Sequence, residues 1–167
     1  MKVSLVVAMD KSQLIGKGNG LPWNRIPADM RRFRELTLGK PVVMGRRTFV
    51  SLGQKPLKER LNVVLSRDRK YEAPNCLLLH SVEDVLKVLA GFEEVMVIGG
   101  AEIYRAFLPH AARIYLTVVA LSFHGDTYFP YVSWANEWHV VESQAVKKGK
   151  LSPYNLVFSV WERNRKP

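Results

Sequence analysis

Residues 94–104 read EVMVIGGAEIY and join a short apolar run to a helical pattern through two adjacent glycines. Glu94–Ile98 has the length and composition of a buried strand, and Ala101–Tyr104 begins a helix. Glycines let a ligand approach the backbone, and the N–H groups at a helix start favour an anion such as pyrophosphate. The alternative is a tight turn that binds nothing. The segment predicts a strand-turn-helix unit at the centre of an α/β sheet.

The rest of the chain repeats this alternation of strands and helices. Residues 3–9 are apolar on both alternating faces, which predicts a central strand. The expected helices begin at Pro27, near Arg46 and at Ser81. Further strands are expected at residues 41–45, 61–66, 77–79, 113–120 and 128–130, followed by a hairpin of residues 138–146 and 154–161. This order predicts a three-layer α/β fold whose central sheet is mostly parallel, with an antiparallel C-terminal edge strand.

Residues 10–26 form a long segment in which Gly16, Gly18, Gly20 and Pro22 interrupt any regular period. Loops of this length in compact domains are usually functional, and the glycines suit a mobile lid. The third glycine falls one residue too early for a Rossmann fingerprint. We therefore expect a lid-like loop without that dinucleotide motif.

Composition narrows the class of protein. The 167 residues suit one domain, and no apolar run approaches the roughly 20 residues that a membrane-spanning helix needs. The N-terminus lacks the pattern of a signal peptide. Cys76 is the single cysteine, so an internal disulfide is excluded and a clustered metal site is not expected. A reducing, cytoplasmic location follows as an expectation.

The net charge of +10 is concentrated in one segment. Between Lys40 and Lys70 the basic residues exceed the acidic ones by seven. Such a patch suits a phosphorylated small molecule, a polynucleotide or simply a solvated face. Phe49 is the one aromatic residue in the segment, which disfavours the stacking surface of a nucleic-acid-binding protein.

Asp29 stands in the stretch LPWNRIPADMRRF, residues 21–33. Pro27 suits the first position of a helix. The helical period places Asp29, Met30 and Phe33 on one face, and a carboxylate among apolar groups should have a raised pKa. The wetter side is expected to carry Arg31, Arg32, Arg34 and Glu35. The simpler interpretation is that Asp29 only stabilises the positive end of the helix dipole.

Five ordered motifs give the chain an end-to-end resemblance to bacterial-type dihydrofolate reductases. They are Ile15-Gly16 with Leu21-Pro22-Trp23, Pro27-Ala28-Asp29, residues 44–49 (MGRRTF), residues 98–104 (IGGAEIY) and residues 125–130 (GDTYFP). The resemblance implies NADPH-dependent reduction of 7,8-dihydrofolate to tetrahydrofolate, in support of one-carbon metabolism and thymidylate synthesis. It also implies one monomeric domain over residues 1–167, with an adenosine-binding subdomain at about residues 40–92 and a loop subdomain from the remainder.

The resemblance assigns Asp29 to the pterin ring and to the proton step, supported by the hydroxyl of Thr117. Arg60 would bind the glutamate α-carboxylate of the substrate. The implied catalytic group is Asp29, Leu21, Trp23 and Thr117. The implied substrate contacts are Val6, Val7, Asp29, Met30, Phe33, Leu52, Leu57, Arg60, Ile98, Tyr104 and Thr117. Dihydrofolate and antifolate-type molecules are the expected partners, without nucleic acid or membrane.

For NADPH, the resemblance places Arg46, Ser66 and Arg67 around the 2′-phosphate, which explains the basic segment. It also implies a cis peptide bond between Gly99 and Gly100. The implied cofactor contacts are Ala8, Ile15, Gly16, Asn19, Gly45, Arg46, Arg47, Thr48, Leu65, Ser66, Arg67, Ile98, Gly99, Gly100, Ala101, Glu102, Ile103 and Tyr104. No metal ligands are implied.

The chain departs from the family pattern at a few positions. Residues 24–26 (NRI) make the approach to Asp29 one residue longer than the common bacterial spacing. Leu21, Arg47 and Arg67 replace residues more frequent in the family. Three rivals remain: a nucleotide- or RNA-binding domain without chemistry, a short-chain pteridine reductase, and a pyrimidine reductase. The second would carry a Tyr-x-x-x-Lys pair, which the sequence lacks, and the third should lack Trp23 with Asp29.

Overall fold

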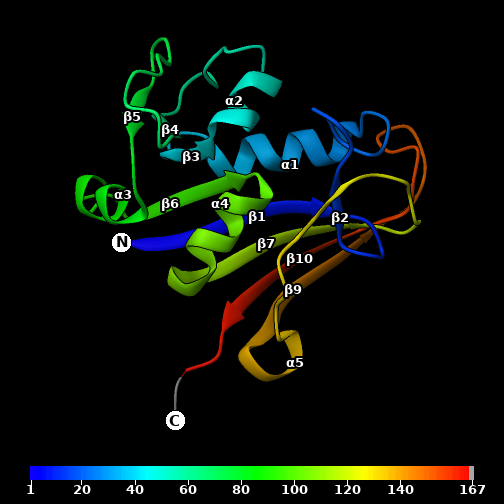
Figure 1. Ribbon diagram of the computed structural model, residues 1–167. Helices are drawn as coiled ribbons and strands as arrows, with labels where there is room; N and C mark the ends of the chain where they lie inside the picture. The colour runs from blue at the N-terminus through cyan, green and yellow to red at the C-terminus, as the bar shows by residue number, and fades with distance from the viewer. Residues whose placement is uncertain (166–167) are drawn as a thin grey trace.

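A twisted eight-stranded sheet forms the centre of the computed structural model, which describes residues 1–165 (Figure 1). In order across the sheet the strands are β5 (Leu77–Leu79), β4 (Asn62–Leu65), β3 (Val42–Gly45), β6 (Glu94–Gly99), β1 (Lys2–Met9), β7 (Ala111–Val119), β10 (Leu156–Arg163) and β9 (Trp138–Val146). The six strands from β5 to β7 pair in parallel. Strand β10 is antiparallel to both of its neighbours, so the reversed strand lies one place inside the edge. The predicted mostly parallel sheet is confirmed.

Helices cover both faces of this sheet. Helices α1 (Pro27–Thr37) and α2 (Arg46–Ser51) lie on one face, and α3 (Val82–Val88) and α4 (Ala101–Phe107) lie on the other (Figure 1). Two short helical turns, η1 (Leu108–His110) and α5 (Trp134–Glu137), complete the helical elements of residues 1–165. The three-layer prediction is therefore confirmed.

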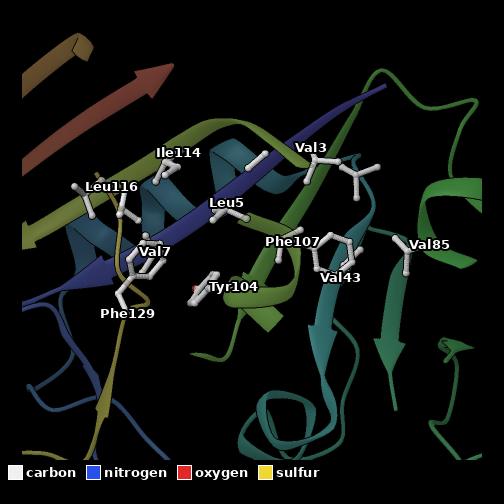
Figure 2. Packing of buried hydrophobic residues seen from close by; sticks show 14 of the residues in the cluster. Val3, Leu5, Val7, Val43, Val85, Tyr104, Phe107, Ile114, Leu116 and Phe129 are labelled. Atoms are coloured by element: carbon white, nitrogen blue, oxygen red, sulfur yellow. The ribbon is translucent and has the colours of Figure 1, made fainter. Parts of the chain in front are cut away.

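Strand β1 separates two apolar cores because successive side chains point to opposite faces. Leu5 and Val7 pack with Phe107 and Val85 on the side of α3 and α4, as Figure 2 shows. Val6 belongs to the other cluster, with Phe49 of α2 and Phe33 of α1. Burial on both faces explains why residues 3–9 read as a continuous apolar run.

The helix boundaries follow local sequence signals. Helix α1 begins at Pro27, as expected from the fixed φ of proline, and Gly39 follows its end with a φ of +74°. Ser81 caps α3 by accepting a hydrogen bond from the backbone N–H of Asp84 at 3.1 Å. Both the predicted start of α1 and the predicted cap of α3 are confirmed.

Residues 10–26 are more ordered than the predicted loop. Leu14–Gly16 form strand β2, which pairs antiparallel with β8 (Thr127–Tyr128) in a second small sheet. Buried Asp10 accepts hydrogen bonds from the N–H groups of Ser12, Leu14 and Phe123 at 2.8 to 2.9 Å. Because the third donor comes from a segment 113 residues away, this anchor could not be read from local sequence.

Replacement of Asp10 by Ala is expected to lower the free energy of unfolding by about 2 kcal/mol, because it leaves backbone donors without their acceptor. Urea unfolding of the variant and of wild type measures the difference. Glu35→Ala, which removes an exposed carboxylate from α1, is the control and should change stability by less than about 0.5 kcal/mol. Equal stability of Asp10→Ala and Glu35→Ala would contradict the anchoring role.

None of the helices within residues 1–165 has the length and apolar character required to cross a membrane. The same residues contain no group of three or more His, Cys, Asp and Glu side chains placed to hold a metal ion. Cys76 is half-buried beside the core of the α1 face, and it forms no disulfide.

Candidate active site

Two helix starts meet at the carboxyl edge of the parallel strands. Helix α2 begins directly after Gly45 at the end of β3, and α4 begins after the Gly99–Gly100 turn at the end of β6. A Cβ atom on Gly100 would lie 3.7 Å from Thr48 Oγ1. A Cβ atom on Gly45 would come within 2.8 Å of the Ile103 side chain, so only glycine fits there without rearrangement. These contacts bring the two predicted phosphate-binding segments together.

The Gly99–Gly100 peptide bond is cis, as the family resemblance implied. Gly99 has a φ of +120°, and a Cβ atom at this position would lie 3.1 Å from the hydroxyl of Tyr104. That hydroxyl lies 2.7 Å from the carbonyl oxygen of Val6 and 2.9 Å from that of Ile98. Burial raises the pKa of Tyr104, so the hydroxyl stays neutral and ties α4 to β1 and β6.

Asp29 lies in the first turn of α1 and faces the central strand β7. The hydroxyl of Thr117 donates a hydrogen bond to Asp29 Oδ1 at 2.7 Å, which is the contact that the resemblance implied. Burial raises the pKa of the Asp29 carboxyl, although the Thr117 hydrogen bond and the charge of Arg32 act in the opposite direction. A carboxyl group with a raised pKa is suited to proton chemistry near neutral pH.

A pocket of about 430 Å³ opens in front of Asp29. Its lining residues are Leu21, Trp23, Arg25, Ile26, Asp29 and Met30. Trp23 and Ile26 are buried, whereas Leu21 is 58% and Met30 48% exposed, so the pocket has a firm wall and an open mouth. An apolar lining around one carboxylate is typical of small-molecule sites.

The longer approach to Asp29 is anchored on the hairpin between β9 and β10. The backbone N–H of Ala28 donates to the carbonyl of Leu151 at 2.8 Å, and that of Asn24 to the hydroxyl of Tyr154 at 3.4 Å. Arg25 reaches the pocket lining, where its Nε lies 3.1 Å from the sulfur of Met30. The longer approach therefore leaves the start of the Asp29 helix intact, and Arg25 places a cation at the pocket mouth.

The prediction that Arg32 lies on the wetter side of α1 is wrong. Arg32 is half-buried and donates to the carbonyl oxygens of Leu116 and Ser159, on β7 and β10. It is three residues after Asp29, a spacing that puts both side chains on the same helix face. Met30, which the helical period places on the same face as Asp29, lines the pocket with it and is 48% exposed at the pocket mouth.

Val7, which the resemblance places in the substrate site, lies on β1 with its side chain in the core on the side of α4. Val6 and Val7 point to opposite faces of β1, and the Val7 side chain packs in the core beside Tyr104 and Phe129 (Figure 2). Asp29 lies on α1, which covers the other face. The Val7 side chain therefore faces away from Asp29, because strand side chains alternate.

Arg60 is held at the far end of α1. Its Nη1 donates to the hydroxyl of Thr37 at 3.0 Å, and its Nε donates to the carbonyl of Lys58 at 2.8 Å. The hydroxyl of Thr37 donates in turn to the carbonyl of Phe33. Leu52 and Leu57 are half-buried and pack, like Phe33, against the core cluster that contains Phe49. The predicted glutamate-binding residue thus has a fixed position beyond the apolar residues assigned to the substrate.

Arg46 belongs to a second polar cluster, at the ends of β3 and β4. Its guanidinium lies 4.3 Å from the ring centroid of Tyr71 and pairs with Asp68 at 3.7 Å. Ser66 Oγ accepts from the Asp68 N–H, and the Ser66 carbonyl lies 2.8 Å from His80 Nδ1. Arg47, which follows Arg46, and Arg67, which follows Ser66, are both exposed. Tyr71, Asp68 and His80 were missed because their proximity depends on loop conformation rather than spacing.

The lid-like segment is tied to the β8 region. The N–H of Gly18 donates to Asp126 Oδ2 at 2.9 Å, and the N–H of Asp126 donates to the carbonyl of Gly16 at 3.0 Å. A Cβ atom on Gly125 would lie 2.5 Å from that carbonyl, which explains the glycine there. The remaining predicted cofactor residues lie on neighbouring strand ends and helix starts: Ala8 on β1, Ile15 on β2, Asn19 after β2, Leu65 on β4, and Ala101 and Glu102 on α4.

Comparison with known sequences identifies related enzymes over almost the whole chain. The family model for dihydrofolate reductase matches residues 2–163. A dihydrofolate reductase type 3 of Salmonella typhimurium is 42% identical over 166 residues, covering 99% of this chain and 100% of the relative. The dihydrofolate reductase of Staphylococcus haemolyticus is 38% identical over 165 residues, covering 99% and 98%.

A solved structure shows the same fold. Dihydrofolate reductase from Enterococcus faecalis, complexed with NADP(H) and RAB-propyl, superposes with a TM-score of 0.91 at 32% sequence identity. The match covers 98% of this chain and 97% of that one. The sequence motifs, the Asp29 pocket, the diglycine turn and these relatives lead to one conclusion: the chain belongs to the dihydrofolate reductase family.

Proposed function

We propose that this chain reduces 7,8-dihydrofolate to 5,6,7,8-tetrahydrofolate with NADPH, in support of one-carbon metabolism and thymidylate synthesis. NADPH, when bound, would supply a hydride to a carbon of the pterin ring, and a proton would be added at the ring nitrogen next to that carbon. The observation that carries the proposal is the Asp29–Thr117 hydrogen bond at the base of an apolar pocket. Family membership and the relatives described above support the assignment.

Asp29 has the chemistry required to orient the pterin. Its two carboxylate oxygens can accept parallel hydrogen bonds from the ring's amino group and adjacent N–H, an arrangement that fixes the ring plane. Thr117 holds the carboxylate in place, and the raised pKa allows Asp29 to promote protonation. Leu21 and Trp23 would limit the access of water at the pocket mouth and wall.

The residues at the strand ends fit NADPH. Gly99, Gly100, Ala101 and Thr48 would hold the pyrophosphate, since side chains larger than hydrogen at the glycines would fill the space against Tyr104 and Thr48. Arg46, Ser66 and Arg67 would surround the 2′-phosphate. Their basic character is what distinguishes a site for NADPH from one for NADH. The NADP(H) complex of the Enterococcus faecalis enzyme supports this cofactor.

The substrate's benzoyl-glutamate portion would extend along α1 toward Arg60. Phe33, Leu52 and Leu57 would contact its apolar part, and the planar fork of Arg60 would bind the α-carboxylate. Residues 40–92 would form the adenosine-binding subdomain, and the remainder of the single domain would form the loop subdomain. A cytoplasmic, monomeric enzyme that binds antifolate-type molecules completes the proposal.

Purified protein is expected to oxidise NADPH only when dihydrofolate is present. The decrease in absorbance at 340 nm measures this reaction, and product identity can be checked by chromatography of the tetrahydrofolate formed. Omission of dihydrofolate is the control for non-specific oxidation. Absence of turnover by folded wild-type protein would refute the proposed reaction.

A further inference from the structure

Arg32 connects α1 to the strand that carries Thr117. Its Nη1 lies 3.0 Å from the carbonyl oxygen of Leu116 and 3.3 Å from Thr117 Oγ1. Its Nη2 donates to the carbonyl oxygen of Ser159 at 3.1 Å, and the guanidinium lies 4.7 Å from the ring centroid of Phe158. A half-buried guanidinium with contacts on two strands has a well-defined position.

These contacts determine the direction of the hydrogen bond to Asp29. A guanidinium can only donate, so Thr117 Oγ1 accepts from Arg32. The threonine hydroxyl has one proton, and Asp29 Oδ1 lies 2.7 Å away to accept it. The chain of donors therefore runs from Arg32 through Thr117 to Asp29.

We propose that Arg32 is a positioning residue that fixes the Thr117 hydroxyl as a donor to Asp29. The catalytic meaning of this role rests on the proposed function of Asp29. With Oδ1 engaged by Thr117, the Asp29 carboxyl group keeps a defined position in the lining of the pocket. A cation on the far side of Thr117 also favours the charged form of the carboxylate and offsets part of the effect of burial.

Other charged and titratable groups surround this pair. Asp29 is approached by Arg25 at the pocket mouth and by the Tyr104 hydroxyl of α4, in addition to Arg32 and Thr117. Arg32 is approached by Tyr115 of β7 and Glu142 of β9 as well as by Asp29. Of the two arginines, Arg32 is the one that contacts Thr117. Removing its charge should therefore favour protonated Asp29.

A purely structural role predicts a different outcome. The bonds from Arg32 to Leu116 and Ser159 could serve only to attach α1 to the sheet. Loss of that attachment would lower stability without moving the titration of Asp29 while the protein remains folded. The titration of Asp29 thus separates the two roles, and it can be measured without substrate.

The test is a carbon-13 NMR titration of the Asp29 carboxyl in ligand-free protein. Arg32→Gln and Arg32→Lys form a matched pair, because both side chains can donate hydrogen bonds but only Lys keeps the charge. Arg31→Gln is the control, since Arg31 is exposed on the same helix. The midpoint is expected to move to higher pH in Arg32→Gln, to move less in Arg32→Lys and to stay unchanged in Arg31→Gln.

The Thr117→Val background tests whether the effect passes through the hydroxyl. Arg32→Gln should move the Asp29 midpoint less in that background than in wild type, because the shared hydrogen bond is already absent. Equal movement in both backgrounds, or no movement in folded Arg32→Gln, would overturn the inference. Thermal unfolding establishes that each variant is folded at the titration temperature. A normal titration response without turnover would instead refute the proposed reaction.

Discussion

Asp29→Asn is expected to lower kcat/KM for dihydrofolate by about 10²- to 10³-fold at neutral pH, a loss typical of removing a group that assists proton transfer. Asparagine keeps an oxygen that can accept from Thr117, so the local hydrogen bond and the fold should persist. It cannot carry a negative charge or release a proton. Initial rates of NADPH oxidation over a range of pH measure the effect.

The activities of wild type and of Asp29→Asn should depend differently on pH. Burial raises the pKa of Asp29, so wild-type activity should fall as pH rises through that pKa and the carboxyl group loses its proton. The Asp29→Asn profile should lack this step. Glu35→Gln, an exposed acid on the same helix, is the control and should retain the wild-type profile. Full activity of Asp29→Asn at neutral pH would eliminate the proton role even if the reaction is correct.

The stability of the wild-type protein should also decrease as pH rises, because of the same ionisation of Asp29. Because the folded-state pKa of Asp29 is raised, the folded state binds this proton more tightly than the unfolded state, and stability decreases as pH rises through the folded-state pKa. Asp29→Asn removes this contribution. Its free energy of unfolding should therefore improve relative to wild type as pH increases, which urea unfolding at several pH values can measure.

The double variant Arg46→Ala with Arg67→Ala is expected to weaken NADPH binding by about 10²- to 10⁴-fold and NADH binding far less. Each lost charge-assisted hydrogen bond to a phosphate contributes about 1.5 to 3 kcal/mol. The 2′-phosphate is absent from NADH, so its affinity should depend little on these arginines. Fluorescence titration with both cofactors gives the ratio of dissociation constants.

A matched loss of charge distinguishes contact from general electrostatic attraction. Lys87→Ala with Lys147→Ala removes two exposed positive charges from other parts of the surface. This control should change the affinities for NADPH and NADH only slightly and to the same extent. If the arginine variant weakens both cofactors equally, the assignment of the 2′-phosphate site is wrong.

Local sequence signals accounted for most of the elements. The apolar run of residues 3–9 became β1, and the segment 94–104 became a strand, a diglycine turn and a helix in that order. The five family motifs identified the family before any geometry was known. Apolar periodicity and glycine spacing act over a few residues, so they can be read directly from the chain.

Contacts between residues far apart in the sequence could not be predicted from these local patterns. Asp10 anchors its loop partly by accepting a hydrogen bond from the N–H of Phe123. Residues Leu14–Gly16 form strand β2 by pairing with β8. Arg32 was assigned to the solvent side although its spacing from Asp29 already placed both on one helix face. Whether that face meets water or β7 depends on how α1 packs.

Local periodicity and motif spacing were sufficient to predict most of the strands and helices, the family, and the chemical types of the residues in the site. Which of those residues are in contact depends on how the elements pack. The Asp29–Thr117 bond spans 88 residues and the Arg32–Ser159 bond spans 127. Contacts at such separations arise from the order and register of strands in the sheet, which no local pattern encodes.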